Sequence, residues 1–151
     1  MDWDKVKRLL KFDVLPFRVV LCLSEEEWLS VCEALNIKDR TWIEDSEHAR
    51  VVNFSNWCVI QMGGDQAQAH VCVHESVHVF QALCQYLSED SPSAEFQAYY
   101  IGYISEWVIR QALEYYSCRS STSGSSEPAS PSQSSSEDTS TLDTFEGPIE
   151  T

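Results

Sequence analysis

The spacing of apolar residues predicts a short helix, a strand and a second helix at the start of the chain. Residues 2–11 carry apolar side chains on one helical face, and Pro16 follows this predicted helix. Residues 17–23 form an apolar run rich in β-branched residues, which is typical of a buried strand. Ser24 precedes three glutamates, the pattern of an N-cap with acids in the first turn. A second helix is therefore expected from there to near Asn36.

The middle of the chain has the pattern of a β-hairpin. Two short apolar runs, residues 49–54 and 57–62, flank the pair Ser55 and Asn56. Two residues of this kind between two strand-like runs are typical of a tight turn. We therefore expect two antiparallel strands here.

Two long helices are expected to follow the hairpin. Asp65 suits the N-cap of a helix over residues 66–87. Ser91 and Pro92 suit the N-cap and the first position of another helix, which is expected to end near Tyr116. Because the connection between them is short, the two helices are expected to form an antiparallel pair.

The order helix, strand, helix, hairpin, helix, helix predicts an α+β fold with a small, mostly antiparallel sheet. Residues 119–151 are mostly Ser, Thr, Pro, Gly, Glu and Asp. A segment of this composition cannot bury enough apolar surface to offset the entropy of ordering it. We therefore expect a folded domain of residues 1–118 and a disordered, Ser-rich acidic tail of residues 119–151.

Charge and cysteine content limit the partners. The formal net charge is −14, and no basic stripe is visible, which argues against binding of nucleic acid. The sequence shows neither a signal peptide nor an apolar run long enough for a membrane span, so a cytoplasmic protein with reduced thiols is expected. No Cys-x-x-Cys pair is present among the six cysteines, and Cys72 and Cys84 are expected in the core.

Two histidines and a glutamate in one predicted helix form a candidate metal site. His74 and His78 are four residues apart in a predicted helix, so both imidazoles lie on one face and can hold one tetrahedral zinc ion. Glu75 is rotated from His74 by about 100°, where its carboxylate can take a proton from a water at the metal. The alternatives are two histidines without a metal and a carboxylate that only orients a ligand.

The next predicted helix offers a third ligand. Glu95 lies in its first turn, and an antiparallel helix pair can turn it toward His78. Tyr99 and Gly102 share that face; Tyr99 is the candidate to stabilise an oxyanion, and Gly102 allows close helix approach. The alternative for Glu95 is an acid favoured by the helix dipole, and for Tyr99 it is core packing.

Other residues fit less well. Tyr100 and Tyr103 are further candidates for the oxyanion role, with core packing as their alternative. His70, one turn before His74, is an alternative ligand, and His48 is expected to be solvated.

The stretch from Val71 to Phe80, Val-Cys-Val-His-Glu-Ser-Val-His-Val-Phe, resembles the extended signature of zincin metallopeptidases. With Glu95 downstream it is similar to the glutamate-zincin branch. This resemblance implies a minimal zincin-like fold, bound zinc and peptide hydrolysis, and it likens the strand over residues 57–62 to the sheet edge that binds substrate. The segment from His74 through Pro92, Glu95 and Tyr99 also resembles small zincin-like proteins encoded by tailed bacteriophages.

Three functions remain open from the sequence. The first is a zinc-dependent metallopeptidase acting on a peptide or protein substrate. The second is a zincin-fold binding or assembly protein that holds a metal but has little turnover, such as a phage morphogenesis protein. The third is a metal-free scaffold whose acidic tail recruits a partner.

Overall fold

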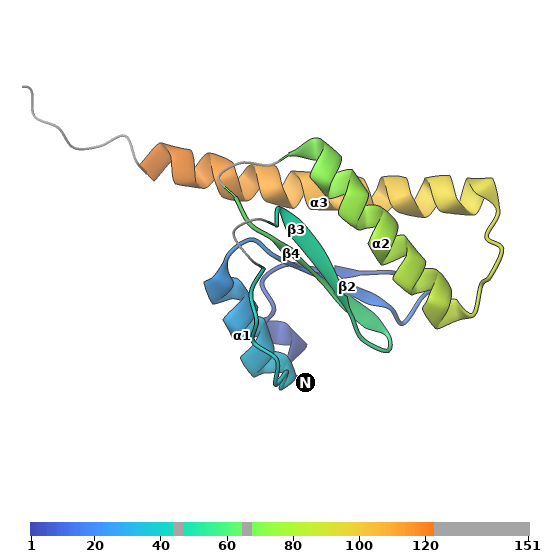
Figure 1. Cartoon of the computed structure of the whole chain (residues 1–151), viewed down its shortest axis with the longest axis horizontal. Helices are drawn as coiled ribbons and strands as arrows, with labels where there is room; N and C mark the ends of the chain where they lie inside the picture. Colours follow the sequence, from blue (N-terminus) through green and yellow to red (C-terminus); the bar gives the residue numbers. More distant parts are fainter. Residues whose placement is uncertain (44–46, 65–67, 123–151) are drawn as a thin grey trace, which may run out of the picture.

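The computed structural model describes residues 1–43, 47–64 and 68–122. The elements in chain order are the short 3-10 helix η1 (Trp3–Lys5), β1 (Leu9–Lys11), β2 (Arg18–Cys22), α1 (Glu25–Leu35), β3 (Ala49–Asn53), β4 (Trp57–Met62), α2 (Ala69–Leu87) and α3 (Ala94–Thr122). They form one sheet with helices on both of its faces (Figure 1). The predicted α+β class is confirmed.

The sheet has the strand order β1-β2-β4-β3. The pairs β1–β2 and β3–β4 are antiparallel, and β2–β4 is parallel. The sheet is therefore mixed, with two antiparallel pairings and one parallel pairing. The likeness of residues 57–62 to a sheet edge is wrong, because β4 lies between β2 and β3, and β3 is the edge strand on that side.

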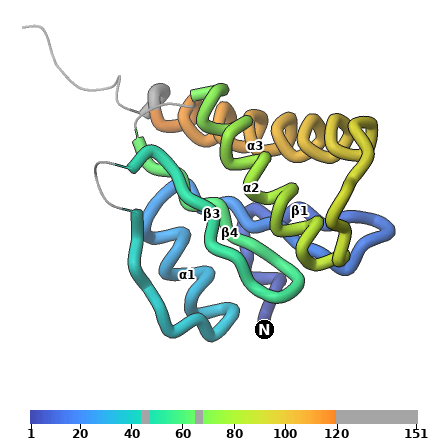
Figure 2. Tube along the Cα trace, turned by 45° about the vertical axis from the view of Figure 1, so that its right-hand side comes forward, coloured from blue at the N-terminus to red at the C-terminus, as the bar shows by residue number. Residues whose placement is uncertain are grey.

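The two faces of the sheet build two separate cores. Val19 and Leu21 of β2 pack under α2 and α3, whereas Val20 and Cys22 pack against α1. Successive side chains of a strand point to opposite faces. Because both faces are covered, β2 carries an unbroken apolar run and not an alternating one. Figure 2 shows α1 on one side of the sheet and α2 with α3 on the other.

The predicted helix over residues 2–11 is wrong. Only η1 is helical there, and β1 pairs with β2 in the register Leu9 to Val20. The Leu21 amide also donates to the Arg8 carbonyl at 3.2 Å. Pairing with a strand that follows it in the sequence satisfies the backbone of this segment and overrides its helical spacing of apolar residues.

The predicted helix after Ser24 and the predicted hairpin are confirmed. The Ser24 hydroxyl accepts a hydrogen bond from the Glu27 amide, and α1 ends at Asn36, whose φ of 57° is left-handed. In the hairpin, the Phe54 amide donates to the Trp57 carbonyl at 2.8 Å, across the predicted two-residue turn. Both features depend on contacts between residues close in sequence.

The two long helices are present, with shifted ends. Helix α2 begins at Ala69, and the predicted cap Asp65 lies outside the described residues. Helix α3 is capped by Ser93, whose hydroxyl accepts from the Phe96 amide, and not by Ser91. In Figures 1 and 2, α3 runs back across α2 obliquely, so the two helices do not lie along one another over their full lengths.

The end of the folded domain also differs from the prediction. Helix α3 continues to Thr122, which takes the first residues of the predicted tail into the helix. Tyr116, only 8% exposed, is the last residue of the described core. The rest of the predicted tail, residues 123–151, lies outside the described residues. Among the helices that are described, none combines the length and the apolar character that a membrane span requires.

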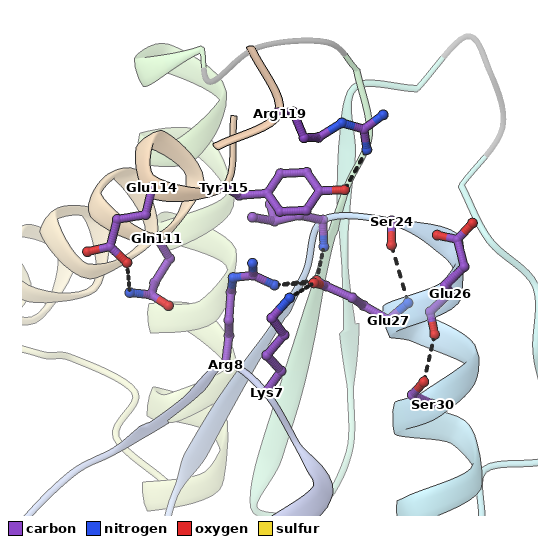
Figure 3. A network of polar contacts seen from close by, with 11 residues as sticks. Lys7, Arg8, Ser24, Glu26, Glu27, Ser30, Gln111, Glu114, Tyr115 and Arg119 are labelled. Carbon is purple, nitrogen blue, oxygen red and sulfur yellow. Dashed lines mark hydrogen bonds and ion pairs between the residues drawn. The ribbon is translucent and has the colours of Figure 1, made fainter. Parts of the chain in front are cut away.

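An ion pair fastens the N-terminal segment to α1 (Figure 3). Both carboxylate oxygens of Glu27 accept hydrogen bonds from the Arg8 guanidinium, and Lys7 adds a contact of 3.2 Å. Arg8 is 8% exposed, and its guanidinium lies over the Tyr115 ring of α3 at 5.1 Å. Arg8, which directly precedes β1, therefore links the N-terminal segment to α1 and α3.

Candidate metal centre

The two histidines lie in a groove between α2 and the edge strand β3. Its volume is about 330 Å³. Helix α2 contributes His74, Glu75, His78, Gln81, Ala82 and Gln85, and the β3 strand contributes Ala49, Arg50, Val51 and Asn53. The polar side chains of α2 in this groove form one stripe along the helix, because they recur at spacings of three and four residues.

The imidazoles of His74 and His78 converge. Their Nε2 atoms are 3.2 Å apart, and the rings are nearly perpendicular, at 80°. Two nitrogens bound at 2.0–2.1 Å to one tetrahedral zinc ion are about 3.3–3.4 Å apart. The pair therefore has the separation that a shared ion requires. In the chain without metal, the same distance is a hydrogen bond between the two rings.

Glu75 is buried beside the pair. It is 5% exposed, and its Oε2 atom has no hydrogen-bond partner. Burial raises the pKa of the Glu75 carboxyl, and the neighbouring His74 and His78 partly oppose this shift. A buried carboxylate oxygen without a partner is costly, so this site calls for a proton, a water or a cation near Oε2.

Gln81 contacts His78 from the next turn of α2. Its Oε1 atom lies 3.1 Å from His78 Nδ1. Gln81 was not among the predicted site residues. Its spacing of three residues from a candidate ligand on the same helix was the signal that was available.

Glu95 does not join the histidine pair in the structure. It is exposed at the start of α3, and its neighbour Phe96 packs against Phe80 at 5.8 Å between ring centroids. Phe80 follows His78 by two residues and is therefore rotated from it by about 200° around α2. The start of α3 thus lies on the side of α2 away from the groove.

Across residues 1–43, 47–64 and 68–122, no group of three or more His, Cys, Asp or Glu side chains is placed to hold a metal ion. The structure therefore gathers His74, Glu75 and His78 in one groove, without the third ligand that was predicted on the following helix.

The tyrosines of α3 lie elsewhere. Tyr99 is 67% exposed and Tyr103 42%, and with Tyr100 and Phe12 they line a different hollow of about 280 Å³. The expected close approach at Gly102 is wrong, because a Cβ atom there would have no neighbour within 4 Å. The face of α3 that was predicted to meet α2 is turned to solvent.

The remaining candidates agree with the simpler interpretations. Cys72 and Cys84 are buried free thiols, as expected for core residues, and burial raises the pKa of both. His48 and His70 are exposed and do not line the groove.

Comparison of the chain with protein-family models, with curated proteins and with solved structures finds no match. Support for a function therefore comes from the groove itself and from the resemblance of its motif.

Proposed function

We propose that this protein is a zinc-dependent metallopeptidase whose metal is held by His74 and His78. The observation that carries the proposal is the 3.2 Å separation of the two Nε2 atoms. Two exposed imidazoles one turn apart need not converge in this way, because each has water as an alternative partner. The resemblance of residues 71–80 to the zincin signature supports the same assignment.

The residues present fit zinc in chemistry as well as in spacing. Neutral imidazole nitrogen is a common zinc ligand. The unpartnered Oε2 of buried Glu75 lines the same groove, so a cation nearby would offset the cost of burying this carboxylate. A zinc ion held by these two donors would have further coordination positions open for water and for a substrate carbonyl.

Glu75 is the general base of the proposed reaction. A bound zinc ion supplies Lewis acidity, which polarises a substrate carbonyl and makes water more acidic. Glu75 accepts the proton of the water that attacks the peptide carbonyl carbon, and it then delivers this proton to the amine nitrogen as the C–N bond breaks. Its place next to His74 in the same groove favours this role, since the carboxylate lies beside the proposed metal position.

The two walls of the groove suit a peptide ligand. One wall is the edge strand β3, and the other is the polar stripe of α2. An unpaired strand edge offers backbone donors and acceptors to a peptide. The lining side chains are mostly uncharged, which favours a peptide backbone over a charged head group as the ligand.

One observation favours the second candidate function, a metal-holding binding or assembly protein with little turnover. Catalytic zinc sites usually have three protein ligands, whereas the described residues bring only the two histidines together. If only two protein donors hold the ion, it binds weakly and hydrolysis is slow. The groove would still be able to bind a ligand.

The test is zinc stoichiometry combined with one substitution. We expect the metal-replete full chain to hold one zinc, and His74→Ala and His78→Ala each to lose it. We expect Glu75→Gln to retain zinc and to lose hydrolysis of a mixed peptide library by about a hundredfold or more, the scale of general-base catalysis. The matched control is Glu106→Gln, the same substitution at an exposed glutamate of α3 that does not line the groove, and it is expected to keep both properties.

Two results would overturn parts of the proposal. Less than one zinc ion per wild-type chain would rule out the proposed metal site, and the metal-free scaffold would remain as the function. One zinc ion per chain without peptide hydrolysis, in both the wild type and Glu75→Gln, would rule out the peptidase. The metal-holding binding or assembly protein would then remain as the function.

A further inference from the structure

Gln81 contacts the candidate ligand His78 at the ring nitrogen that faces away from His74. The Nε2 atom of His78 faces His74 at 3.2 Å, and its Nδ1 atom faces Gln81 Oε1 at 3.1 Å. Both nitrogens of His78 therefore have a partner, and the two partners together restrict where its proton lies.

The amide oxygen of Gln81 accepts hydrogen bonds and donates none. Because Oε1 faces Nδ1, the proton of a neutral His78 lies on Nδ1. Its Nε2 atom then carries a lone pair, which is the form that binds a metal. With the His78 proton on Nδ1, the 3.2 Å contact between the two Nε2 atoms requires His74 Nε2 to be the donor. This arrangement puts the two histidines in different tautomeric forms before metal binding.

We propose that Gln81 is a positioning residue that holds His78 as the Nδ1–H tautomer and presents its Nε2 lone pair to a metal ion shared with His74. This inference rests on the proposed zinc site. Histidine ligands of metal ions commonly donate a hydrogen bond from their second ring nitrogen to an acceptor of this kind. This hydrogen bond fixes the orientation of the ring and increases the basicity of the nitrogen that binds the metal. Gln81 supplies that acceptor from within the same helix.

The same stripe offers a matched control. Gln85 is also exposed and also lines the groove, one turn beyond Gln81. Among the described residues its side chain makes no hydrogen bond to either histidine. Both glutamines lie on the solvent side of α2, so replacing either one is expected to change stability little.

The first experiment reads the tautomers in the full chain without metal. Long-range ¹H–¹⁵N correlation spectra at alkaline pH distinguish Nδ1–H from Nε2–H imidazoles. The chain has 4 histidines, and single substitutions assign their signals. We expect His78 as Nδ1–H and His74 as Nε2–H. We expect Gln81→Leu to shift His78 toward the Nε2–H form, and Gln85→Leu to leave it unchanged.

The second experiment measures zinc affinity by competition with a chelating dye. We expect Gln81→Leu to weaken binding about tenfold or more, the usual effect of losing such an acceptor. Gln81→Glu, which keeps an acceptor at this position, is expected to restore binding, and Gln85→Leu is expected to bind like wild type. On addition of zinc to the wild-type chain, the tautomer of His74 changes and that of His78 does not.

The outcomes separate the two proposals. A zinc-binding wild type whose His78 is Nε2–H overturns the role of Gln81 alone, as does a Gln81→Leu variant with unchanged affinity. A wild-type chain that binds no zinc overturns the metal site and, with it, the metal role of Gln81. The predicted tautomers together with the selective loss in Gln81→Leu support both.

Discussion

At the scale of single residues, the candidate metal centre depends on the orientation of two side chains. His74 and His78 are exposed, so the spacing of α2 alone does not fix their rings. The contact with Gln81 and the contact between the rings hold His78 at both nitrogens. A site prepared in this way loses less side-chain entropy when an ion binds.

Glu95 gives the sharpest prediction at this scale. Because α3 starts on the side of α2 marked by the Phe80–Phe96 contact, Glu95→Gln is expected to change zinc affinity by less than about twofold. His78→Ala, as the positive control, is expected to abolish binding. The measurement is the same chelator competition. A loss of about tenfold or more in Glu95→Gln would show that Glu95 reaches the ion after all, as the resemblance to glutamate-zincins implies.

The sequence predicted part of the site at this scale. His74, Glu75 and His78 lie together because a helix fixes the relation between residues one and four positions apart. Gln81 follows the same rule and was identifiable in principle. Glu95 and Tyr99 depended on how one helix is rotated against another, and this rotation is set by apolar packing far from either residue, such as Ile104 and Val108 against the sheet.

At the scale of elements, the Arg8–Glu27 pair decides how the N-terminal segment is held. Glu27 makes two kinds of contact at the start of α1. Its amide donates a hydrogen bond to the Ser24 hydroxyl, and its carboxylate accepts hydrogen bonds from Arg8 and from the Leu23 amide. Burial alone raises the pKa of Glu27, but these hydrogen bonds outweigh it and leave the pKa below its ordinary value.

The direction of the pH dependence follows from this shift. A carboxyl whose pKa is lower in the folded state stabilises the fold above its unfolded pKa, which is about 4.3 for Glu. The contribution is complete at neutral pH and is lost as the pH falls through the lower, folded pKa. Protonated Glu27 can no longer balance the charge of buried Arg8.

We therefore expect Glu27→Gln to lower the free energy of unfolding at neutral pH by roughly 2–3 kcal/mol. The difference from wild type should shrink as the pH is lowered to about 3.5. Urea unfolding at several pH values measures both effects. Glu33→Gln, on the exposed side of the same helix, is the control and should cost little. An equal cost at all pH values would contradict the assigned role of the carboxylate charge.

At the scale of the whole molecule, the core under α2 and α3 joins the groove to the sheet. Leu83 of α2 is fully buried there. The strand β4, central in the sheet, faces this core with one set of side chains and the α1 core with the other. The position of α2 over β3, and hence the groove, is set by this packing.

Two equivalent substitutions test this arrangement. Leu83→Ala is expected to lower the free energy of unfolding by about 2–5 kcal/mol, because it removes a fully buried side chain and leaves a cavity. Leu113→Ala makes the same chemical change on α3, where Leu113 is 53% exposed, and should cost less than about 1 kcal/mol. Urea or thermal unfolding measures both. Similar costs for the two variants would mean that the α3 face carrying Leu113 is covered.

The sequence by itself determined the features that depend on neighbours along the chain. These are the capped helix α1, the hairpin of β3 and β4, and the face of α2 that carries His74 and His78. Each is fixed by hydrogen bonds or side-chain spacing within a few residues, and such contacts form in the same way wherever the element is placed.

Only the tertiary structure decided the features that depend on distant partners. The apolar residues of segment 2–11 fit a helix, yet β2 offered its backbone a strand to pair with. The Glu95 and Tyr99 face of α3 could have met α2, but the opposite, more apolar face was buried instead. In both cases the burial of apolar surface and the pairing of backbone groups across the fold outweighed local preference, because they involve more area and more hydrogen bonds than any contact within the segment.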